Sequence, residues 1–212
     1  MALLPLSEDE MESGIKILSQ KDPRLVTLFD QFNVPALKDE ENYFWSLCRS
    51  IIYQQISGKA AQAISERFIN LFPSKIDLKP RQILETDINN FYGVGLSKQK
   101  ANYIKNIASA FYNNIIDENN LSNLSDDDII KILTSIKGVG PWTAEMFLIF
   151  TLKRPNVLPL TDLGIQKGFK IFFSMNEMPS IKFMKNESRK WEPYKTIVSL
   201  YLWFAVEGPF EW

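Results

Sequence analysis

Apolar residues recur at intervals of three and four along most of the chain, which is the period of a helix that buries one face. Residues 43–52 show the pattern clearly, with apolar positions at Tyr43, Phe44, Leu47, Cys48, Ile51 and Ile52. No stretch alternates with the two-residue period of a β-strand. The sequence therefore predicts an all-α fold, with helices over about 8–18, 23–32, 43–52, 60–69, 80–91, 98–111, 126–136, 141–151, 163–173 and 191–203.

Residues that favour helix starts precede several of these segments. Ser7 with Glu10 three positions later forms a capping-box signature, in which a hydroxyl and a carboxylate satisfy the first backbone amides. Ser97 and Ser125 are placed to cap two further helices. Pro141 suits a first helical position, because its φ is fixed and it has no N–H to leave unpaired.

Residues 133–150 predict two helices joined by a hairpin. Gly138 and Gly140 end the first helix, and Pro141 begins the second. Backbone amides at such a helix start form an anion site. We therefore expect the amides of Gly138, Val139 and Gly140 to bind a phosphate together with Lys137. A tight helix connection with no bound anion is the alternative from these glycines alone.

The amino-acid composition excludes several kinds of catalytic and metal site. The 212 residues include one cysteine and no histidine, which excludes an intramolecular disulfide, a four-cysteine cluster and any imidazole base or ligand. Cys48 lies on a helical apolar stripe, so we expect it in the core. The first residues contain neither a basic segment nor a long apolar run. We therefore expect no membrane segment and a cytoplasmic location.

Charge is unevenly distributed along the chain, although the net charge is only −1. Residues 1–42 carry nine acidic and four basic side chains, whereas residues 129–176 carry six basic and two acidic ones. The basic stretch contains the predicted hairpin. This distribution is compatible with a surface that contacts phosphates, or with ordinary solvated faces.

Residues 136–144 (Ile-Lys-Gly-Val-Gly-Pro-Trp-Thr-Ala) resemble the helix-hairpin-helix (HhH) of DNA glycosylases, and most closely the DNA-3-methyladenine glycosylase II family. Segments 157–169, 191–203 and 51–61 are similar to three further motifs of that family, in the same order. The resemblance spans roughly residues 40–207. It implies a single HhH-GPD unit, 1–212, with two helical lobes around a cleft. Lobe A comprises about 45–155 and lobe B about 1–44 plus 156–212. The 42 residues before Tyr43 are too few for the amino-terminal β domain of many members.

The resemblance implies a catalytic role for Asp162. A fixed carboxylate stabilises the oxocarbenium character that develops as a base leaves its sugar, and it can orient the attacking water. Asp162 also suits the N-cap of the helix that follows, and the two roles are compatible. Relatives with lyase activity carry a lysine where this chain has Trp142. A monofunctional enzyme is therefore expected.

The same resemblance implies the residues that contact a flipped base and its duplex. Gln55, with Ile56 beside it, matches the DNA wedge, although Gln55 could instead cap a helix end. In the base pocket, Met146, Leu163 and Gly164 stand where aromatic or bulkier residues occur in the family, which leaves the substrate range open. The expected pocket residues are Trp203, Trp142, Met146, Leu163 and Tyr53.

Contacts with the DNA backbone and with ions are also expected. Lys59 and Lys98 are candidate phosphate contacts, although Lys98 and Lys100 could equally be only solvated. In similar hairpins, backbone carbonyls bind a monovalent cation, Na⁺ or K⁺. The corresponding carbonyls here belong to Thr134, Ile136 and Val139. No organic cofactor or divalent metal is expected.

Together these features predict a monomeric DNA repair glycosylase that excises alkylated purines, of the 3-methyladenine and 7-methylguanine type, from double-stranded DNA. It would be associated with the nucleoid, or nuclear in a eukaryote. Two alternatives remain open: a non-catalytic HhH DNA-binding module, and a glycosylase for deaminated or oxidised bases.

Overall fold

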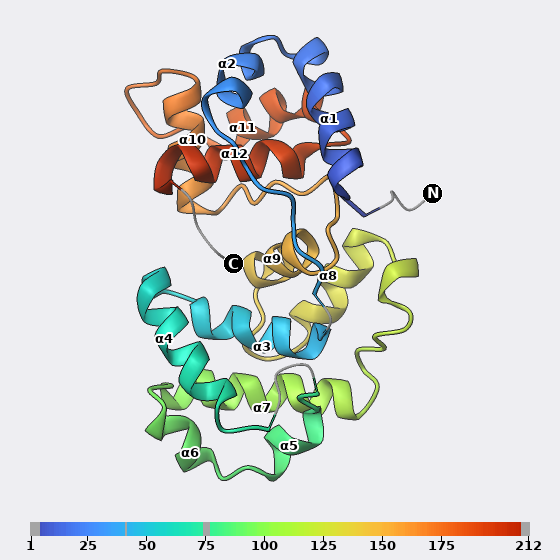
Figure 1. The fold of residues 1–212 in the computed structure, drawn as a ribbon, viewed down its shortest axis with the longest axis vertical. Coiled ribbons are helices and arrows are strands. Elements are labelled where there is room, and N and C mark those ends of the chain that lie inside the picture. Colours follow the sequence, from blue (N-terminus) through green and yellow to red (C-terminus); the bar gives the residue numbers. More distant parts are fainter. Residues whose placement is uncertain (1–4, 41, 74–76, 209–212) are drawn as a thin grey trace. The chain divides into compact units, whose positions relative to one another are not determined.

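The computed structural model describes residues 5–40, 42–73 and 77–208. These residues form α-helices and two short 3-10 helices joined by loops, and no strand occurs among them (Figure 1). The predicted all-α fold is therefore confirmed. In the same described ranges, no helix is long and apolar enough to cross a bilayer.

The chain forms two compact units. The terminal unit contains residues 5–38 and 148–208, and the central unit contains residues 39–147, apart from those not described. Because the terminal unit combines the beginning and the end of the chain, its core depends on contacts between residues far apart in sequence.

The terminal unit is built around α12 (Lys195–Glu207). Residues 196–204 of this helix are all buried, and α10 (Leu163–Phe172), α1 (Glu8–Lys21) and the 3-10 helix η2 (Ser188–Trp191) pack against it. A helix that is apolar on all sides is typical of a core position. The remaining helices of this unit are α2 (Arg24–Gln31) and α11 (Ile181–Glu187). The sequence analysis did not predict α11.

The central unit is built around α3 (Tyr43–Tyr53), which packs against α4 (Gly58–Ile69) and α7 (Lys98–Tyr112). Trp45 stacks on Phe68 with ring centroids 5.7 Å apart, and Phe68 also contacts Phe91 at 5.2 Å. Other helices in this unit are α5 (Pro80–Glu85), α6 (Ile88–Gly93), η1 (Leu121–Asn123) and α8 (Asp126–Thr134). Helix α9 (Pro141–Phe150) begins here as well.

The single helix predicted over residues 80–91 is wrong, because the structure divides it into α5 and α6. Thr86 has an extended backbone, and its hydroxyl donates to the Gln82 carbonyl. The next residue, Asp87, caps α6 by accepting from the Asn89 amide at 2.9 Å. These local side-chain bonds compete with a continuous helix.

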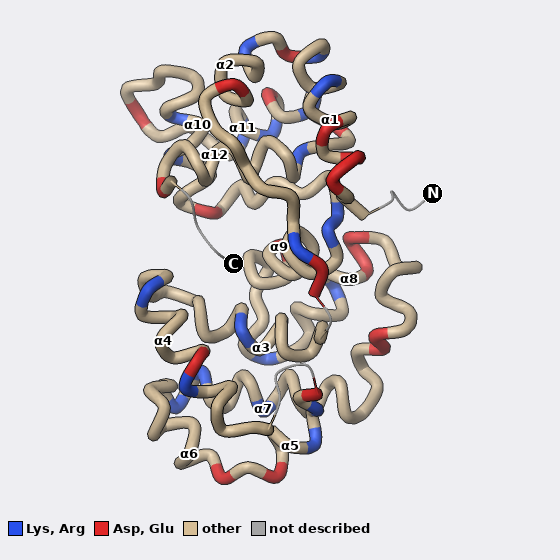
Figure 2. Tube along the Cα trace, viewed as in Figure 1, with Lys and Arg blue, Asp and Glu red and all other residues tan. Residues whose placement is uncertain are grey.

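Acidic residues occupy the first turns of α1 and α8, at the positive ends of the helix dipoles (Figure 2). Ser7 accepts from the Glu10 amide and Ser125 from the Asp128 amide, both at 3.2 Å. The serine caps are therefore confirmed at both helices, whereas the reciprocal half of the capping box does not form, because the Ser7 amide donates to the Pro5 carbonyl.

Candidate active site

Asp162 is the N-cap of α10. Its Oδ1 accepts a hydrogen bond from the Ile165 amide at 2.9 Å and another from the Trp203 indole Nε1 at 2.8 Å. The first bond is local, whereas the second joins residues 41 positions apart. Because two donors hold one oxygen, the carboxylate has a defined orientation at the start of the helix.

Trp203 lies on α12 and is 6% exposed. Its indole stacks on the Phe150 ring with centroids 5.7 Å apart and an interplanar angle of 27°. Stacking fixes the plane of the indole, and its N–H fixes Asp162. The two predicted residues thus form one hydrogen-bonded pair.

Gly164 makes this pair possible. A Cβ at this position would lie 2.7 Å from Trp203 Cδ1 and 3.0 Å from Asp162 Oδ1. Both distances are too short for ordinary non-bonded contacts. The absence of a side chain therefore allows the indole to reach over the first turn of α10 to the carboxylate.

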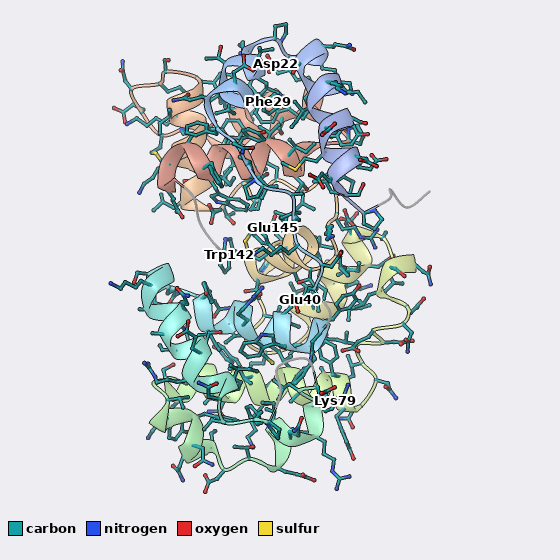
Figure 3. All side chains as sticks on the ribbon, viewed as in Figure 1. Asp22, Phe29, Glu40, Lys79, Trp142 and Glu145 are labelled. Atoms are coloured by element: carbon teal, nitrogen blue, oxygen red, sulfur yellow. The ribbon has the colours of Figure 1, made fainter. Side chains whose placement is uncertain are left out.

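The other predicted pocket residues are divided between the units. Leu163 follows Asp162 in the terminal unit and is 57% exposed. The remaining three belong to the central unit: Tyr53 and Trp142 are half-buried, and Met146 is buried. Trp142 projects from the start of α9 (Figure 3).

The hairpin between α8 and α9 forms as predicted, with Gly138 at a φ of 112°. A Cβ on Gly138 would lie 2.1 Å from the Tyr103 ring, so both its backbone angle and its surroundings require glycine. The Val139 amide donates to the Ile136 carbonyl at 3.0 Å within the turn. It is therefore engaged inside the protein, unlike the phosphate donor that the sequence predicts.

The carbonyls of the hairpin have specific partners. Asn106 on α7 donates to the Lys137 carbonyl at 2.9 Å, and Gln54 donates to the Gly138 carbonyl at 3.3 Å. The Ile136 carbonyl, one of the predicted cation ligands, accepts from Val139. Among the residues described, no three His, Cys, Asp or Glu side chains are grouped as a metal site.

The turn between α3 and α4 presents Gln55 and Ile56 at the surface. Gln55 is exposed and has a φ of 57°, in the left-handed region that non-glycine residues rarely adopt. Ile56 is 39% exposed. The C-cap of α3 is Gln54 rather than Gln55, so the alternative in which Gln55 caps the helix does not hold.

The predicted basic contacts differ in their surroundings. Lys59 and Lys98 are exposed at the starts of α4 and α7. Lys100 is half-buried, and its Nζ donates to the carbonyls of Ile52 and Gln54, both at 2.7 Å. Burial lowers the pKa of the Lys100 ammonium.

Comparison with known proteins shows the family of this chain. The model of the HhH-GPD superfamily of base excision DNA repair proteins matches residues 48–193. The chain belongs to this superfamily. This range includes the α3–α4 turn, the hairpin and Asp162.

Among curated relatives, the putative DNA-3-methyladenine glycosylase YfjP of Bacillus subtilis is 30% identical over 94% of this chain and 76% of its own length. Among solved structures, the Schizosaccharomyces pombe 3-methyladenine DNA glycosylase Mag1, in complex with abasic DNA, has a TM-score of 0.84. It is 29% identical over 94% of this chain and 100% of that one. A DNA-3-methyladenine glycosidase from Bacillus halodurans has a TM-score of 0.81, with 32% identity over 98% and 93% of the two chains.

Three residues of this HhH-GPD chain hold or accommodate predicted functional residues within their own unit, and the sequence analysis did not predict this. Gly164 was noted only as a departure from the family pattern, and its position in a helical first turn, where glycine has a low propensity, is the available signal. Gln54 and Lys100 carried no signal that separates them from surface residues. Their roles depend on contacts with residues 84 and 46 positions away.

Proposed function

We propose that this chain is a monofunctional DNA glycosylase that flips alkylated purines out of duplex DNA and hydrolyses their N-glycosidic bond. The proposal is supported by the names and coverage of its relatives and by the match to the superfamily model. The observation that carries it is the Asp162 carboxylate, oriented by the Ile165 amide and the Trp203 indole at the start of α10.

The reaction needs an anion beside the sugar. The bond between C1′ and the purine nitrogen breaks, its electron pair leaves with the base, and positive charge develops on the deoxyribose. Asp162 stabilises that charge and orients a water molecule, whose oxygen forms the new bond to C1′ while its proton passes to the carboxylate. Because Trp142 occupies the position of the lyase lysine, no Schiff base forms and the abasic site is left uncut.

Alkylated purines such as 3-methyladenine and 7-methylguanine suit this site because they are cationic. Their charge makes them good leaving groups, and an electron-rich indole attracts them by a cation–π contact. Trp203, held by its hydrogen bond to Asp162, is the proposed source of this contact. Leu163, in the same unit as Trp203, belongs to this proposed site, and the base-contacting roles of Trp142, Met146 and Tyr53 stay predictions.

Flipping leaves a gap in the duplex that a side chain must fill. Gln55 is suited to this role because it is exposed at the tip of a tight turn, with its backbone held in the left-handed region. Ile56 adds an exposed apolar surface beside it. Strained backbone of this kind is frequent at functional sites.

The hairpin is the proposed contact with the DNA backbone. The Gly138 and Gly140 amides, for which the described residues offer no acceptor, bind a phosphate together with Lys137. Lys59 and Lys98 contact flanking phosphates. The carbonyls of Thr134, Ile136 and Val139 are the proposed ligands of a Na⁺ or K⁺ ion, because Thr134 ends α8 at the negative end of its dipole and each carbonyl oxygen has two lone pairs.

Replacement of Asp162 by asparagine tests the proposal. Asparagine caps helices as well as aspartate and keeps an oxygen for both donors, so Asp162→Asn removes the charge and little else. We expect release of 3-methyladenine and 7-methylguanine from alkylated duplex DNA to fall by about 100-fold or more. The free energy of unfolding should change by less than about 1 kcal/mol. Equal base release by both proteins would refute the catalytic role.

A non-catalytic HhH DNA-binding module is the second candidate, favoured by the fact that Asp162 serves as an ordinary N-cap. The two functions separate when wild-type protein is incubated with duplexes that each contain one alkylated, deaminated or oxidised base. Binding without release of any base supports the module. Release before alkali, with strand cleavage only after alkali, supports a monofunctional glycosylase and identifies its substrate.

A further inference from the structure

The side chain of Gln54 joins the α3–α4 turn to both sides of the hairpin. Its Nε2 donates to the Gly138 carbonyl at 3.3 Å and to the Thr143 hydroxyl oxygen at 2.9 Å. Gly138 lies in the loop and Thr143 in the first turn of α9, where it is 1% exposed. We call this pair of hydrogen bonds the Gln54 bridge.

The backbone of the same turn is fixed separately. Lys100 on α7 donates to the carbonyls of Ile52 and Gln54, so its ammonium group is hydrogen-bonded to carbonyls at the C-terminal end of α3. Such carbonyls have no partner within the helix and carry the negative end of its dipole. Gln54 is thus held through its side chain by the hairpin and through its carbonyl by α7.

These contacts surround the one strained residue of the turn. Gln55 follows Gln54 directly, and its backbone lies in the left-handed region, which is unfavourable for a residue with a side chain. A strained conformation persists only where its neighbours determine it. The nearest determinants are the two anchors of Gln54, since Gln55 itself is exposed.

We propose that Gln54 is a positioning residue that couples the DNA wedge to the phosphate-binding hairpin. A phosphate bound to the Gly138 amide holds the hairpin backbone, and with it the Gly138 carbonyl, in place. The Gln54 bridge to that carbonyl then holds the turn that carries Gln55. Binding of the DNA backbone therefore promotes insertion of the wedge. This inference rests on the proposed roles of Gln55 and of the hairpin.

The test is a double-mutant cycle between Gln54 and Gln55. Gln54→Met keeps the length of the side chain but removes both donated hydrogen bonds. We expect the kcat for release of 7-methylguanine to fall by about tenfold, because small misplacements of a reacting substrate have large effects on rate. Fluorescence of 2-aminopurine placed beside an abasic-site analogue, which reports unstacking, should fall in parallel. Affinity for undamaged duplex should change by less than about threefold, since hairpin and lysine phosphate contacts supply nonspecific binding.

The decisive comparison is made in a protein that has no wedge. In the Gln55→Ala background, Gln54→Met should reduce kcat by less than about twofold, because a residue that acts through Gln55 has nothing left to position. An equal reduction in both backgrounds would show a general structural role and would overturn the inference. So would an unchanged kcat and an unchanged fluorescence in Gln54→Met with Gln55 present.

Two further variants separate loss of the Gln54 bridge from a general effect of a Gln→Met substitution. Gln62→Met, on the exposed surface of α4, is the matched control and should behave as wild type. Thr143→Val removes one acceptor of the bridge while leaving Gln54 intact, and a smaller loss of kcat is expected, again only when Gln55 is present. If Gln54→Met does not fold, the cycle is run with Thr143→Val, and the same outcomes decide.

Failure of the proposed function is separable from failure of this inference. Wild-type protein that releases no base from any lesion duplex refutes the glycosylase, yet the fluorescence cycle still measures the coupling. Wild-type protein that releases base, combined with additive effects of Gln54→Met and Gln55→Ala, refutes the coupling alone.

Discussion

At the scale of single residues, Gly164 determines how closely Trp203 approaches Asp162. A methyl group added at Gly164 would stand 2.7 Å from the indole and 3.0 Å from the carboxylate oxygen, so one of them must move. Alanine has a higher helix propensity than glycine by about 1 kcal/mol. In Gly164→Ala this gain in folding stability partly offsets the destabilisation caused by crowding. The geometry of the pair is therefore more sensitive to the substitution than the stability of the fold.

We expect Gly164→Ala to lower kcat for alkylpurine release by about tenfold. Thermal unfolding should shift by only a few degrees, because the propensity gain offsets part of the crowding. Gly93→Ala is the control, since a Cβ at Gly93 would meet no atom within 4 Å. Unchanged release by Gly164→Ala would mean that the contact between Trp203 and Asp162 does not matter for catalysis.

Sequence patterns predicted the local structure of some single residues well and that of others poorly. Asp162 was predicted both as a cap and as the catalytic carboxylate, and its cap geometry is confirmed by the Ile165 hydrogen bond. Its catalytic role stays a prediction. For Lys100 the sequence offered a phosphate contact or a solvated side chain, and neither alternative included its hydrogen bonds to the distant Ile52 and Gln54 carbonyls.

At the scale of elements, the α8–α9 hairpin depends on two glycines that differ in their requirements. Gly138 has a positive φ and packs against Tyr103, whereas Gly140 has open space around its α-carbon. The sequence pattern treats the two positions alike. The structure separates them, because only one is both strained and enclosed.

We therefore expect Gly138→Ala to lower the free energy of unfolding by about 2 kcal/mol or more, from left-handed strain plus the contact with Tyr103. Affinity for duplex DNA should fall with it, because the hairpin amides shift. Gly140→Ala should lower the free energy of unfolding by less than about 0.5 kcal/mol and reduce DNA affinity less than Gly138→Ala does. Urea unfolding and fluorescence anisotropy measure both quantities, and equal effects of the two variants would contradict the distinction.

At the scale of the whole molecule, the terminal unit joins segments from both ends of the chain, and Asp22 is one of the links. Asp22, which Figure 3 labels, is 3% exposed, and its carboxylate accepts from Arg24 at 2.8 Å and from the indole of Trp191 at 3.0 Å. Burial by itself would raise the pKa of Asp22, but these hydrogen bonds and the charges of Lys190 and Arg24 lower it to about 2.

This lowered pKa predicts how stability depends on pH. Because the folded-state pKa lies below the ordinary value of 3.8, the stabilisation is fully present above pH 3.8 and is lost as the pH falls toward 2. We expect Asp22→Asn to lower the free energy of unfolding at pH 7 by about 2 kcal/mol, with the gap to wild type narrowing below pH 4.

Urea unfolding between pH 2.5 and 7 measures this gap. The exposed Asp30→Asn on α2 is the control, and it should stay within about 0.5 kcal/mol of wild type throughout. A gap between Asp22→Asn and wild type that remains constant across the range would show that the charge of Asp22 does not stabilise the fold.

The sequence alone determined the helical class, the starts of α1, α8 and α10, and the hairpin, because each depends on interactions within a few residues. Caps act over three positions, and glycine and proline act on their own backbone angles. Only the tertiary structure decided which side chains meet across the chain. Trp203 reaches Asp162 over 41 positions and Gln54 reaches Gly138 over 84. No periodicity encodes such contacts, because they arise when separate helices pack around α12 and α3.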